Sequence, residues 1–421
     1  MRRYFGTDGV RGIVGHDLTS ALVERLGRAV TLWMGGGAVL IGRDTRASGR
    51  ELERAFASGV ASAGGNAMLA GVLPTPAVAL LALDLGAVIT ASHNPPEYNG
   101  VKLFDGDGQK LPDEAEEEIE ALLGESPRNA DAGEIDNLDV VHGSYVDHVI
   151  ERFGEDLEEL RIGVDCANGA YAGIAPAAFE RLGARVTPIG DSPDGNNINV
   201  DCGATDLRAL QKLVVDESLD LGVAFDGDGD RMLAVDERGE AVDGDQILAA
   251  LALELDVDMV AVTTMANLGL HRLMEERGIR VVTTDVGDRY VLEALRREGG
   301  VLGGEQSGHL IYLDGHVTGD GLVAALLLCK ALRGRRLSET VAVMDRFPQV
   351  MENIRVTDKE LTPAIRERVE ETNAQLAGRG RVLVRPSGTE PVVRVLAEAQ
   401  NEEEARNLCG TIASLVSTEL G

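Results

Sequence analysis

The chain has 421 residues with 40 basic and 70 acidic side chains, which gives a formal net charge of −30 at pH 7. A chain of this length exceeds one hydrophobic core, so we expect several domains. So acidic a balance argues against nucleic acid or an anionic membrane as the main partner, and no apolar run reaches the roughly 18 residues of a membrane helix. Self-repulsion of this charge predicts a halophilic source, with an acidic mesophile as the alternative.

The N-terminus and the cysteines indicate a cytoplasmic protein. The opening residues MRRYFGTDGV lack an apolar stretch after their charges and do not resemble a signal peptide. The cysteines at positions 166, 202, 329 and 409 form no C-x-x-C pair. Such wide spacing is typical of reduced thiols rather than of disulfide or zinc frameworks.

Strands and helices alternate along most of the chain. Short apolar, β-rich runs predict strands at residues 38–42, 87–91, 161–165, 185–190, 219–225, 259–264 and 280–284. Helical periodicity predicts helices at residues 49–64, 175–184, 205–216, 267–277 and 288–297. Repeated β-α-β order is typical of parallel sheets with crossover helices.

The pattern changes in the last part of the chain. Two strands, VLVRP and VVRVLAEA, flank the turn SGTE, and an amphipathic helix follows at residues 401–420. Together with an acidic connector at residues 114–139 and turn-rich stretches near 244 and 348, this predicts four domains. The expected domains are residues 1–145, 146–244 and 245–348, all α/β with mixed or parallel sheets, and a smaller α+β domain at residues 349–421.

A stiff loop, TASHNPPEYNG at residues 90–100, follows the strand predicted at residues 87–91. Pro95 and Pro96 remove two backbone donors and restrict the residues before them. Ser92 should therefore lie just beyond the end of a strand, where α/β sheets bind ligands. The loop lacks the G-x-S-x-G pattern of a hydrolase. Ser92 is either an ordinary turn serine or a phosphoserine, which would carry about −1.5 to −2 charges and three acceptor oxygens.

An acidic loop lies in LGVAFDGDGDRMLAVD, where Asp226, Asp228 and Asp230 stand between two apolar runs. In a straight strand, residues two apart are separated by roughly 6.5 Å, too far to share a Mg²⁺ ion at about 2.1 Å. The chain must therefore curl, which Gly227 and Gly229 permit. Clustered carboxylates favour a bound cation over mutual repulsion. A solvated acidic turn is the alternative. An EF-hand is excluded, because its loop needs glycine at the sixth position, where this chain has Arg231.

Two further loops have the composition of sites for phosphorylated ligands. RPSGTEPVVR at residues 385–394 offers an arginine, two hydroxyls and turn amides, which together suit a phosphate. GGEQSGH at residues 303–309 offers an acceptor and a hydroxyl suited to sugar hydroxyls, and a histidine that can carry a proton. Each loop in isolation could equally be an ordinary turn. No Walker A motif and no convincing G-x-G-x-x-G follows a strand, which disfavours nucleotide binding.

The motifs TASHNP, DGDGDR, GEQSGH and RPSGTEP occur in this order, and together they resemble the α-D-phosphohexomutase superfamily. The resemblance runs from YFGTDGVRG at residues 4–12 to the tail domain. YFGTDGVRG, DVGDRYV at residues 285–291 and GEQSGH resemble the phosphoglucosamine mutase branch more than the phosphomannomutase/phosphoglucomutase branch. The second proline of SHNPPEYNG, where bacterial members of that branch usually have an aromatic residue, and the short chain are similar to an archaeal type.

The resemblance implies four domains around a central cleft, each supplying one motif. It implies that Ser92 is phosphorylated in the active enzyme and that one Mg²⁺ ion is held by this residue and by Asp226, Asp228 and Asp230. Lys102, in NGVK, would be a general acid or base.

The same resemblance implies the remaining site residues. Arg11, Arg231 and His309 would support Lys102. Glu305 and Ser307 would contact sugar hydroxyls. The phosphate that is not transferred would be held by Arg385, Ser387, Gly388 and Thr389.

The implied activity is that of an isomerase. It would interconvert glucosamine 6-phosphate and glucosamine 1-phosphate through a phosphoserine enzyme and a bisphosphorylated sugar. A mutase of the same fold acting on mannose or glucose phosphates is one alternative. A non-catalytic sugar-phosphate-binding protein is another.

Overall fold

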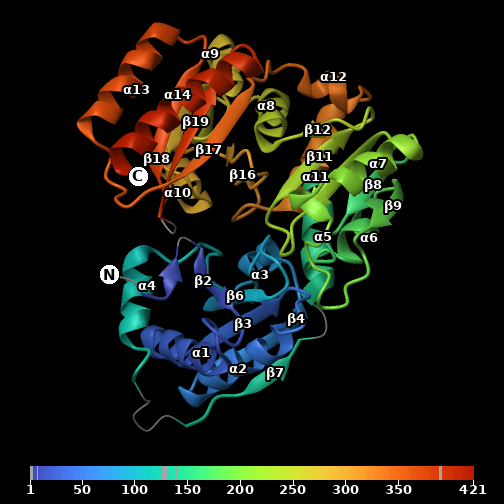
Figure 1. The fold of residues 1–421 in the computed structure, drawn as a ribbon. Helices are drawn as coiled ribbons and strands as arrows, with labels where there is room; N and C mark the ends of the chain where they lie inside the picture. Colours follow the sequence, from blue (N-terminus) through green and yellow to red (C-terminus); the bar gives the residue numbers. More distant parts are fainter. Residues whose placement is uncertain (1–2, 7, 126–130, 139–140, 388–390) are drawn as a thin grey trace. The chain divides into compact units, whose positions relative to one another are not determined.

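The computed structural model describes residues 3–6, 8–125, 131–138, 141–387 and 391–421 (Figure 1). Its contacts divide the chain into two compact units. The first comprises residues 1–264 and 280–342, and the second comprises residues 265–279 and 343–421. Within the described residues, no helix combines the length and the apolar character needed to cross a membrane.

The first unit begins with a seven-stranded sheet. Its strands are β1 (Phe5–Gly6), β2 (Gly9–Ile13), β3 (Ala38–Arg43), β4 (Asn66–Val72), β5 (Leu85–Ile89), β6 (Tyr98–Asp105) and β7 (Ile135–Asn137). The helices are α1 (Ser20–Met34), α2 (Gly49–Ser62), α3 (Thr75–Leu80) and α4 (Asp113–Ala121). The strand order is β1-β2-β6-β5-β3-β4-β7. The adjacent strands β5, β3, β4 and β7 run parallel to one another, whereas β6 is antiparallel to its two neighbours, β5 and β2.

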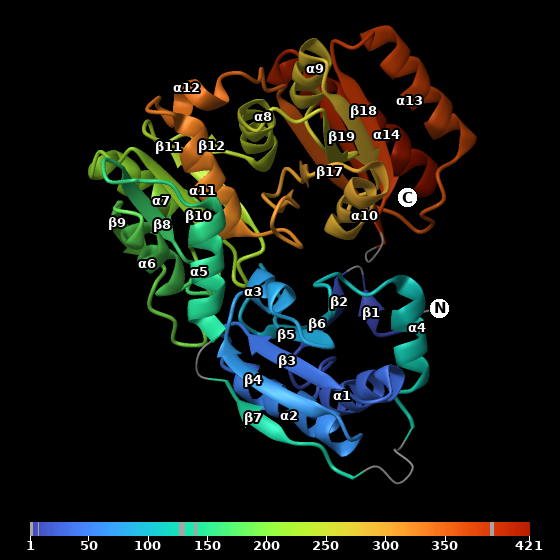
Figure 2. The same cartoon turned by 180° about the vertical axis from the view of Figure 1, so that it is seen from behind.

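Helices α1 and α2 lie side by side in this part of the unit (Figures 1 and 2). Two glycines make the close approach possible. A Cβ atom added at Gly59 would lie 1.9 Å from the carbonyl oxygen of Glu24, and one added at Gly27 would lie 2.2 Å from that of Phe56. Val23, Leu26 and Val60 are buried in the core beneath the two helices. The backbones therefore touch where only glycine fits.

A five-stranded sheet follows. Its strands are β8 (Arg161–Asp165), β9 (Arg185–Ile189), β10 (Leu221–Phe225), β11 (Met232–Asp236) and β12 (Ala241–Val242). The helices are α5 (Val141–Phe153), α6 (Ile174–Arg181) and α7 (Arg208–Asp216), with a 3₁₀ turn, η1, at Gly203–Thr205. In the order β12-β11-β10-β8-β9, the last three strands run parallel, and β11 is antiparallel to both of its neighbours.

A four-stranded sheet completes the first unit. Its strands are β13 (Met259–Thr263), β14 (Arg280–Thr284), β15 (Leu302–Gly304) and β16 (Leu310–Tyr312). The helices are α8 (Gly244–Glu254), α10 (Asp288–Glu298), α11 (Gly321–Leu332) and α12 (Leu337–Val341). The order is β14-β13-β15-β16, with only β16 antiparallel. Helix α11 is apolar and buried except at Lys330, and Asp320 caps its N-terminus.

The second unit is smaller and contains an antiparallel sheet. Its elements are α9 (Leu268–Arg277), β17 (Gln349–Arg355), α13 (Pro363–Leu376), β18 (Arg381–Pro386), β19 (Val392–Glu398) and α14 (Glu402–Leu420). The strand order is β17-β19-β18. Cys409, Ile412 and Val416 on one face of α14 join Val393 and Val395 of β19 in a single core. The three α/β domains with mixed sheets and the smaller fourth domain confirm the fold class expected from the sequence.

In each of the four sheets, a loop that carries one motif joins two antiparallel strands that are neighbours both in the sequence and in the sheet. These pairs are β5–β6, β10–β11, β15–β16 and β18–β19. The loops that join them contain the four motifs singled out in the sequence. Most of the strands and helices predicted from periodicity are present within two or three residues of their expected limits, but β6, which pairs with β5, was not among them.

The α1–α2 contact gives a test of the fold. Gly59→Ala should destabilise the protein by about 1–3 kcal/mol, because the added methyl group overlaps a backbone oxygen. Gly143→Ala is the matched control, since an added Cβ atom there meets nothing within 4 Å. Denaturant unfolding of both variants measures the effect, and equal stabilities would contradict the packing described for α1 and α2.

Candidate active site

The loop after β5 holds Ser92 in one conformation. Ser92 is fully buried and has φ 52°, a left-handed conformation that is uncommon for serine. The buried Arg46 guanidinium donates hydrogen bonds to the carbonyl oxygens of Ser92 at 2.9 Å and Asn94 at 2.8 Å. The side-chain amide of Asn199, which lies in the domain of the five-stranded sheet, donates through Nδ2 to the same Ser92 oxygen at 2.8 Å. These donors offset the cost of a strained backbone, of order 1–3 kcal/mol.

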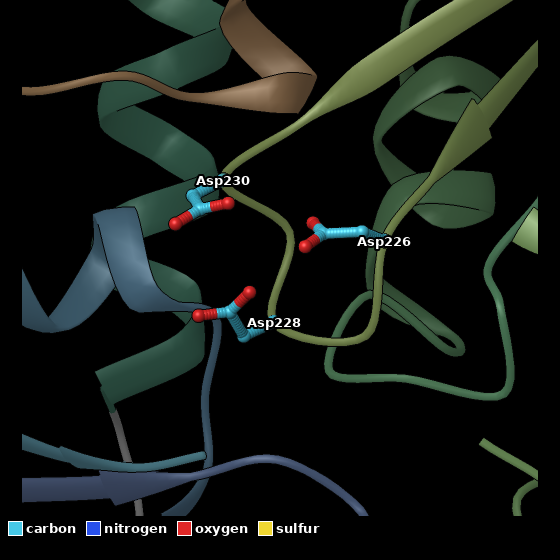
Figure 3. Close-up of side chains that lie close together, drawn as sticks. All are labelled: Asp226, Asp228 and Asp230. Atoms are coloured by element: carbon cyan, nitrogen blue, oxygen red, sulfur yellow. The ribbon is translucent and has the colours of Figure 1, made fainter. Parts of the chain in front are cut away.

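The acidic loop between β10 and β11 curls as its glycines predict. Gly229 has φ 80°. Gly227 is needed for another reason, because an added Cβ atom there would lie 2.7 Å from the carbonyl oxygen of Ser92. Figure 3 shows Asp226, Asp228 and Asp230 directing their carboxylates toward a common space, and one oxygen of each lies within 4.8 Å of the others.

The serine and the acidic loop meet directly. The Ser92 hydroxyl donates to Oδ2 of Asp226 at 2.6 Å. The other Asp226 oxygen accepts from the backbone amides of Gly229 at 3.1 Å and Arg231 at 3.2 Å. A hydroxyl from the first sheet and a carboxylate from the second are thus in contact although 134 residues separate them.

The aspartate cluster has the properties of a cation site. Burial, together with the charges of Asp230 and Asp228, raises the pKa of Asp226 well above its usual range. Asp228 Oδ1 is buried and accepts no hydrogen bond within the described part of the chain. A divalent cation would meet that oxygen and remove the repulsion among the carboxylates. The donor set therefore fits a metal ion of the oxygen-preferring kind.

Lys102 of β6 neutralises part of this charge. Its ammonium lies 2.7 Å from Oδ2 of both Asp228 and Asp230, and 3.3 Å from Oδ2 of Asp8. Burial alone would lower the pKa of Lys102, but the three carboxylates hold it well above its usual range. Lys102 is therefore a buried cation in this arrangement.

The other expected residues of the first unit lie around the same cluster. Arg11 pairs with Asp8 and donates to the carbonyl oxygen of Ala91 at 3.4 Å. Arg231 Nε is 3.8 Å from Oδ1 of Asp230.

The loop between β15 and β16 contributes a histidine and a carboxylate. His309 has Nδ1 at 3.7 Å from Oδ1 of Asp230 and Nε2 at 3.4 Å from Oδ2 of Asp288. Burial opposes protonation of His309, but Asp288 and Asp230 raise its pKa. Glu305 accepts from the amide of Gly287 at 3.2 Å, and burial raises its pKa. Ser307 lies on the same loop and is exposed.

The structure adds charged residues that the sequence reasoning missed. Lys110 pairs with both Asp8 and Asp288, so it links the first domain to α10. Asp8 and Asp288 lie inside the motifs YFGTDGVRG and DVGDRYV, but nothing in those motifs assigned them partners. Lys110 had one usable signal, because only five lysines occur in the whole chain. His93, 3.4 Å from the Ser92 hydroxyl, is also new, and burial with Arg231 and Arg11 lowers its pKa to about 4.

The fourth motif lies in the second unit. Arg385 is on β18, and Ser387 is buried just after that strand, with its amide donating to Val392 at 2.8 Å. Lys359 donates to the carbonyl oxygen of Ser387 at 2.9 Å and is a further basic residue that the sequence reasoning missed. Gly388 and Thr389 lie outside the described residues.

Comparison with known proteins identifies the family. Four models of phosphoglucomutase/phosphomannomutase match in order: domain I at residues 2–129, domain II at 143–239, domain III at 243–347 and the C-terminal domain at 351–415. The chain belongs to this family, and hence to the α-D-phosphohexomutase superfamily. It is a phosphohexomutase-type isomerase.

Individual proteins that are similar to this chain carry more specific names than the family models do. Phosphoglucosamine mutase from Moorella thermoacetica is 47% identical over 442 residues, covering 99% of this chain and 100% of that protein. Phosphoglucosamine mutase from Thermobifida fusca is 47% identical over 446 residues, covering 100% and 99%. Among solved structures, a phosphoglucomutase/phosphomannomutase family protein from Burkholderia thailandensis shares the fold, with a TM-score of 0.83 at 24% identity over 98% of this chain and 97% of that one.

The cation site can be tested without any assay of activity. A divalent cation at a hundredfold excess over its dissociation constant should stabilise the protein by about 2.7 kcal/mol. Asp228→Asn should abolish most of this increment, because it removes a charge from the cluster. Thermal unfolding with and without Mg²⁺ at fixed ionic strength measures it.

General screening of the acidic surface needs a matched control. Asp216→Asn removes one exposed carboxylate, which pairs with Lys212 on the surface of α7, and should keep the full increment. An equal increment in both variants would show that Mg²⁺ acts by screening alone.

Proposed function

We propose that this chain is a phosphoglucosamine mutase, which interconverts glucosamine 6-phosphate and glucosamine 1-phosphate. The single observation that carries the chemistry is the 2.6 Å contact between the Ser92 hydroxyl and Asp226 within the aspartate cluster. The relatives named above support the choice of sugar, because their names specify glucosamine phosphate.

Ser92 is proposed to carry the phosphoryl group that is exchanged. The C1 hydroxyl of glucosamine 6-phosphate attacks the phosphorus, the bond from phosphorus to Ser92 Oγ breaks, and a bisphosphorylated sugar results. After this intermediate reorients, Ser92 Oγ attacks the phosphorus at C6, the bond from phosphorus to the C6 oxygen breaks, and glucosamine 1-phosphate is released. The enzyme regains its phosphoserine, so phosphate is neither gained nor lost. Such transfers depend on alignment and charge neutralisation.

A divalent cation, proposed to be one Mg²⁺ ion, would be held by Asp226, Asp228, Asp230 and phosphorylated Ser92, and would supply positive charge next to the transferred group. A solved N-acetylphosphoglucosamine mutase from Aspergillus fumigatus, in complex with GlcNAc-6P and magnesium, supports this choice of ion.

Lys102 is proposed to handle the proton of the attacking hydroxyl. While it pairs with two carboxylates it stays protonated, so it must leave at least one of them and give up its own proton before it can accept one from the substrate. Arg11 and Arg231 add positive charge near the phosphoryl group, and His309 is a second proton carrier.

The substrate-binding residues are proposed from two loops. Glu305 and Ser307 would accept from and donate to sugar hydroxyls. The phosphate that is not being transferred would be bound by Arg385, Ser387, Gly388 and Thr389, now joined by Lys359. Each of the four proposed domains, residues 1–145, 146–244, 245–348 and 349–421, thereby supplies one loop. We propose a cytoplasmic enzyme that binds a hexose or hexosamine phosphate as its substrate and has neither nucleic acid nor a membrane as a partner.

Ser92→Ala should lower the rate of mutase turnover by about 10³-fold or more, because the proposed transfer runs through Ser92 Oγ and alanine has no oxygen to carry the phosphoryl group. The fold should be intact, as judged by circular dichroism. Coupled assay of glucosamine 1-phosphate formation measures the rate. Turnover near the wild-type level would contradict the role of Ser92, whereas a wild-type protein that binds the substrate without turnover would be only a sugar-phosphate-binding protein.

The choice of sugar is tested by comparing kcat/KM on the 1-phosphates of glucosamine, glucose and mannose. We expect the highest value for glucosamine 1-phosphate. A higher value on glucose or mannose 1-phosphate would assign the chain to a phosphoglucomutase or phosphomannomutase activity instead, with the same chemistry at Ser92.

A further inference from the structure

A buried polar cluster lies directly behind the acidic loop and takes no part in the proposed chemistry. It consists of Tyr145 on α5, Tyr171 before α6, and His316 and Asp320 before α11, and we call it the Asp320 cluster. All four side chains are buried. Three segments far apart in the sequence therefore converge on one carboxylate.

The contacts within the Asp320 cluster are short. Tyr171 donates to Asp320 Oδ1 at 2.7 Å, and Tyr145 donates to Oδ2 at 2.8 Å. His316 Nε2 lies 3.0 Å from Oδ2. Burial and the nearby Asp320 charge raise the pKa of both tyrosines well above its usual range, so both hydroxyls keep their protons. Against the effect of burial, His316 and the two hydroxyls lower the pKa of Asp320, which is the acceptor.

Tyr171 connects this cluster to the acidic loop. A Cβ atom added at Gly229 would lie 2.4 Å from Cε2 of Tyr171, so the ring lies flush against that glycine. The ring centroid is also 4.7 Å from that of Phe225, the residue just before Asp226. Tyr171 thus contacts the loop at its start and at its left-handed turn.

Asp320 connects the cluster to the same loop by a second route. Its Oδ1 accepts from the amides of Leu322 at 2.8 Å and Val323 at 3.1 Å, which fixes the first turn of α11. The next residue, Gly321, donates its amide to the carbonyl oxygen of Gly229 at 3.0 Å. A Cβ atom added at Gly321 would lie 2.7 Å from the carbonyl oxygen of Arg231.

We propose that Asp320 is a positioning residue for the aspartate triad. Its carboxylate holds the Tyr171 ring and the Gly321 amide against the back of residues 225–231, so that the three carboxylates on the other side stay converged on one cation. This inference rests on the proposed function, because it concerns the same cation site. Outer groups of this kind typically change metal affinity by about 10- to 100-fold when removed.

Two tyrosines with the same partner offer a matched test. Both contact Asp320, both are fully buried, and their hydroxyls lie 2.6 Å apart, but only the Tyr171 ring contacts the acidic loop in the interactions that carry the inference. Tyr171→Leu and Tyr145→Leu remove the same atoms from the interior. A merely structural role predicts equal effects, whereas a positioning role predicts unequal ones.

The measurement is direct binding of Mn²⁺ to the full-length protein, monitored through the paramagnetic resonance signal of free Mn²⁺. Thermal unfolding in metal-free buffer measures the stability of each variant. Tyr171→Leu should weaken Mn²⁺ binding by about 10-fold or more. Tyr145→Leu should bind near the wild-type level at a similar loss of stability. Equal dissociation constants for the two variants would overturn the inference.

If either leucine variant fails to fold, Tyr171→Phe and Tyr145→Phe decide in the same way, because each removes only one hydroxyl. Weaker Mn²⁺ binding by Tyr171→Phe than by Tyr145→Phe supports the role of Asp320, and equal binding overturns it. Wild-type protein that binds no Mn²⁺ would contradict the cation site of the proposed function itself. Wild-type binding with no difference between the paired variants would contradict only the positioning role.

Discussion

Three buried carboxylates within 4.8 Å of one another are the constraint that the rest of the first unit accommodates. Like charges in a water-poor environment repel strongly, and each must gain a partner or lose its charge. Lys102 forms ion pairs with Asp228 and Asp230, and the Ser92 hydroxyl donates a hydrogen bond to Asp226. The partners come from β6 and from the loop after β5. The charge balance of the second domain is therefore completed by residues of the first.

Backbone geometry makes this meeting possible. The motif loops of the first unit join antiparallel neighbours, which can turn tightly, whereas parallel strands need long crossovers. The close contacts of the acidic loop then need glycine. A side chain at Gly227 would overlap the carbonyl oxygen of Ser92, and one at Gly229 would overlap the Tyr171 ring. Arg46 and Asn199 bind the Ser92 loop through its carbonyl oxygens and leave the hydroxyl directed at Asp226. The fold thus fixes the backbone of both loops and leaves their side chains for chemistry.

Periodicity and composition were enough to predict the α/β class, most of the parallel strands and the curl at Gly229, because these depend on local burial and local dihedral angles. They were not enough for Lys110 and Asp8, since an ion pair between distant residues leaves no local pattern. The Asp320 cluster escaped for the same reason. Tyr171 and Asp320 each look like ordinary residues until the fold brings them together. The halophilic source and the archaeal type expected from the sequence stay predictions.

The central claim is that Ser92 and the three aspartates share one cation. A crystal structure of the phosphorylated protein soaked in Mn²⁺, with data collected at the manganese absorption edge, tests it most directly. The account predicts a single anomalous peak at about 2.1–2.2 Å from one oxygen each of Asp226, Asp228, Asp230 and the Ser92 phosphate. A peak that lies on the aspartates but out of reach of Ser92, or no peak at this cluster, would contradict it.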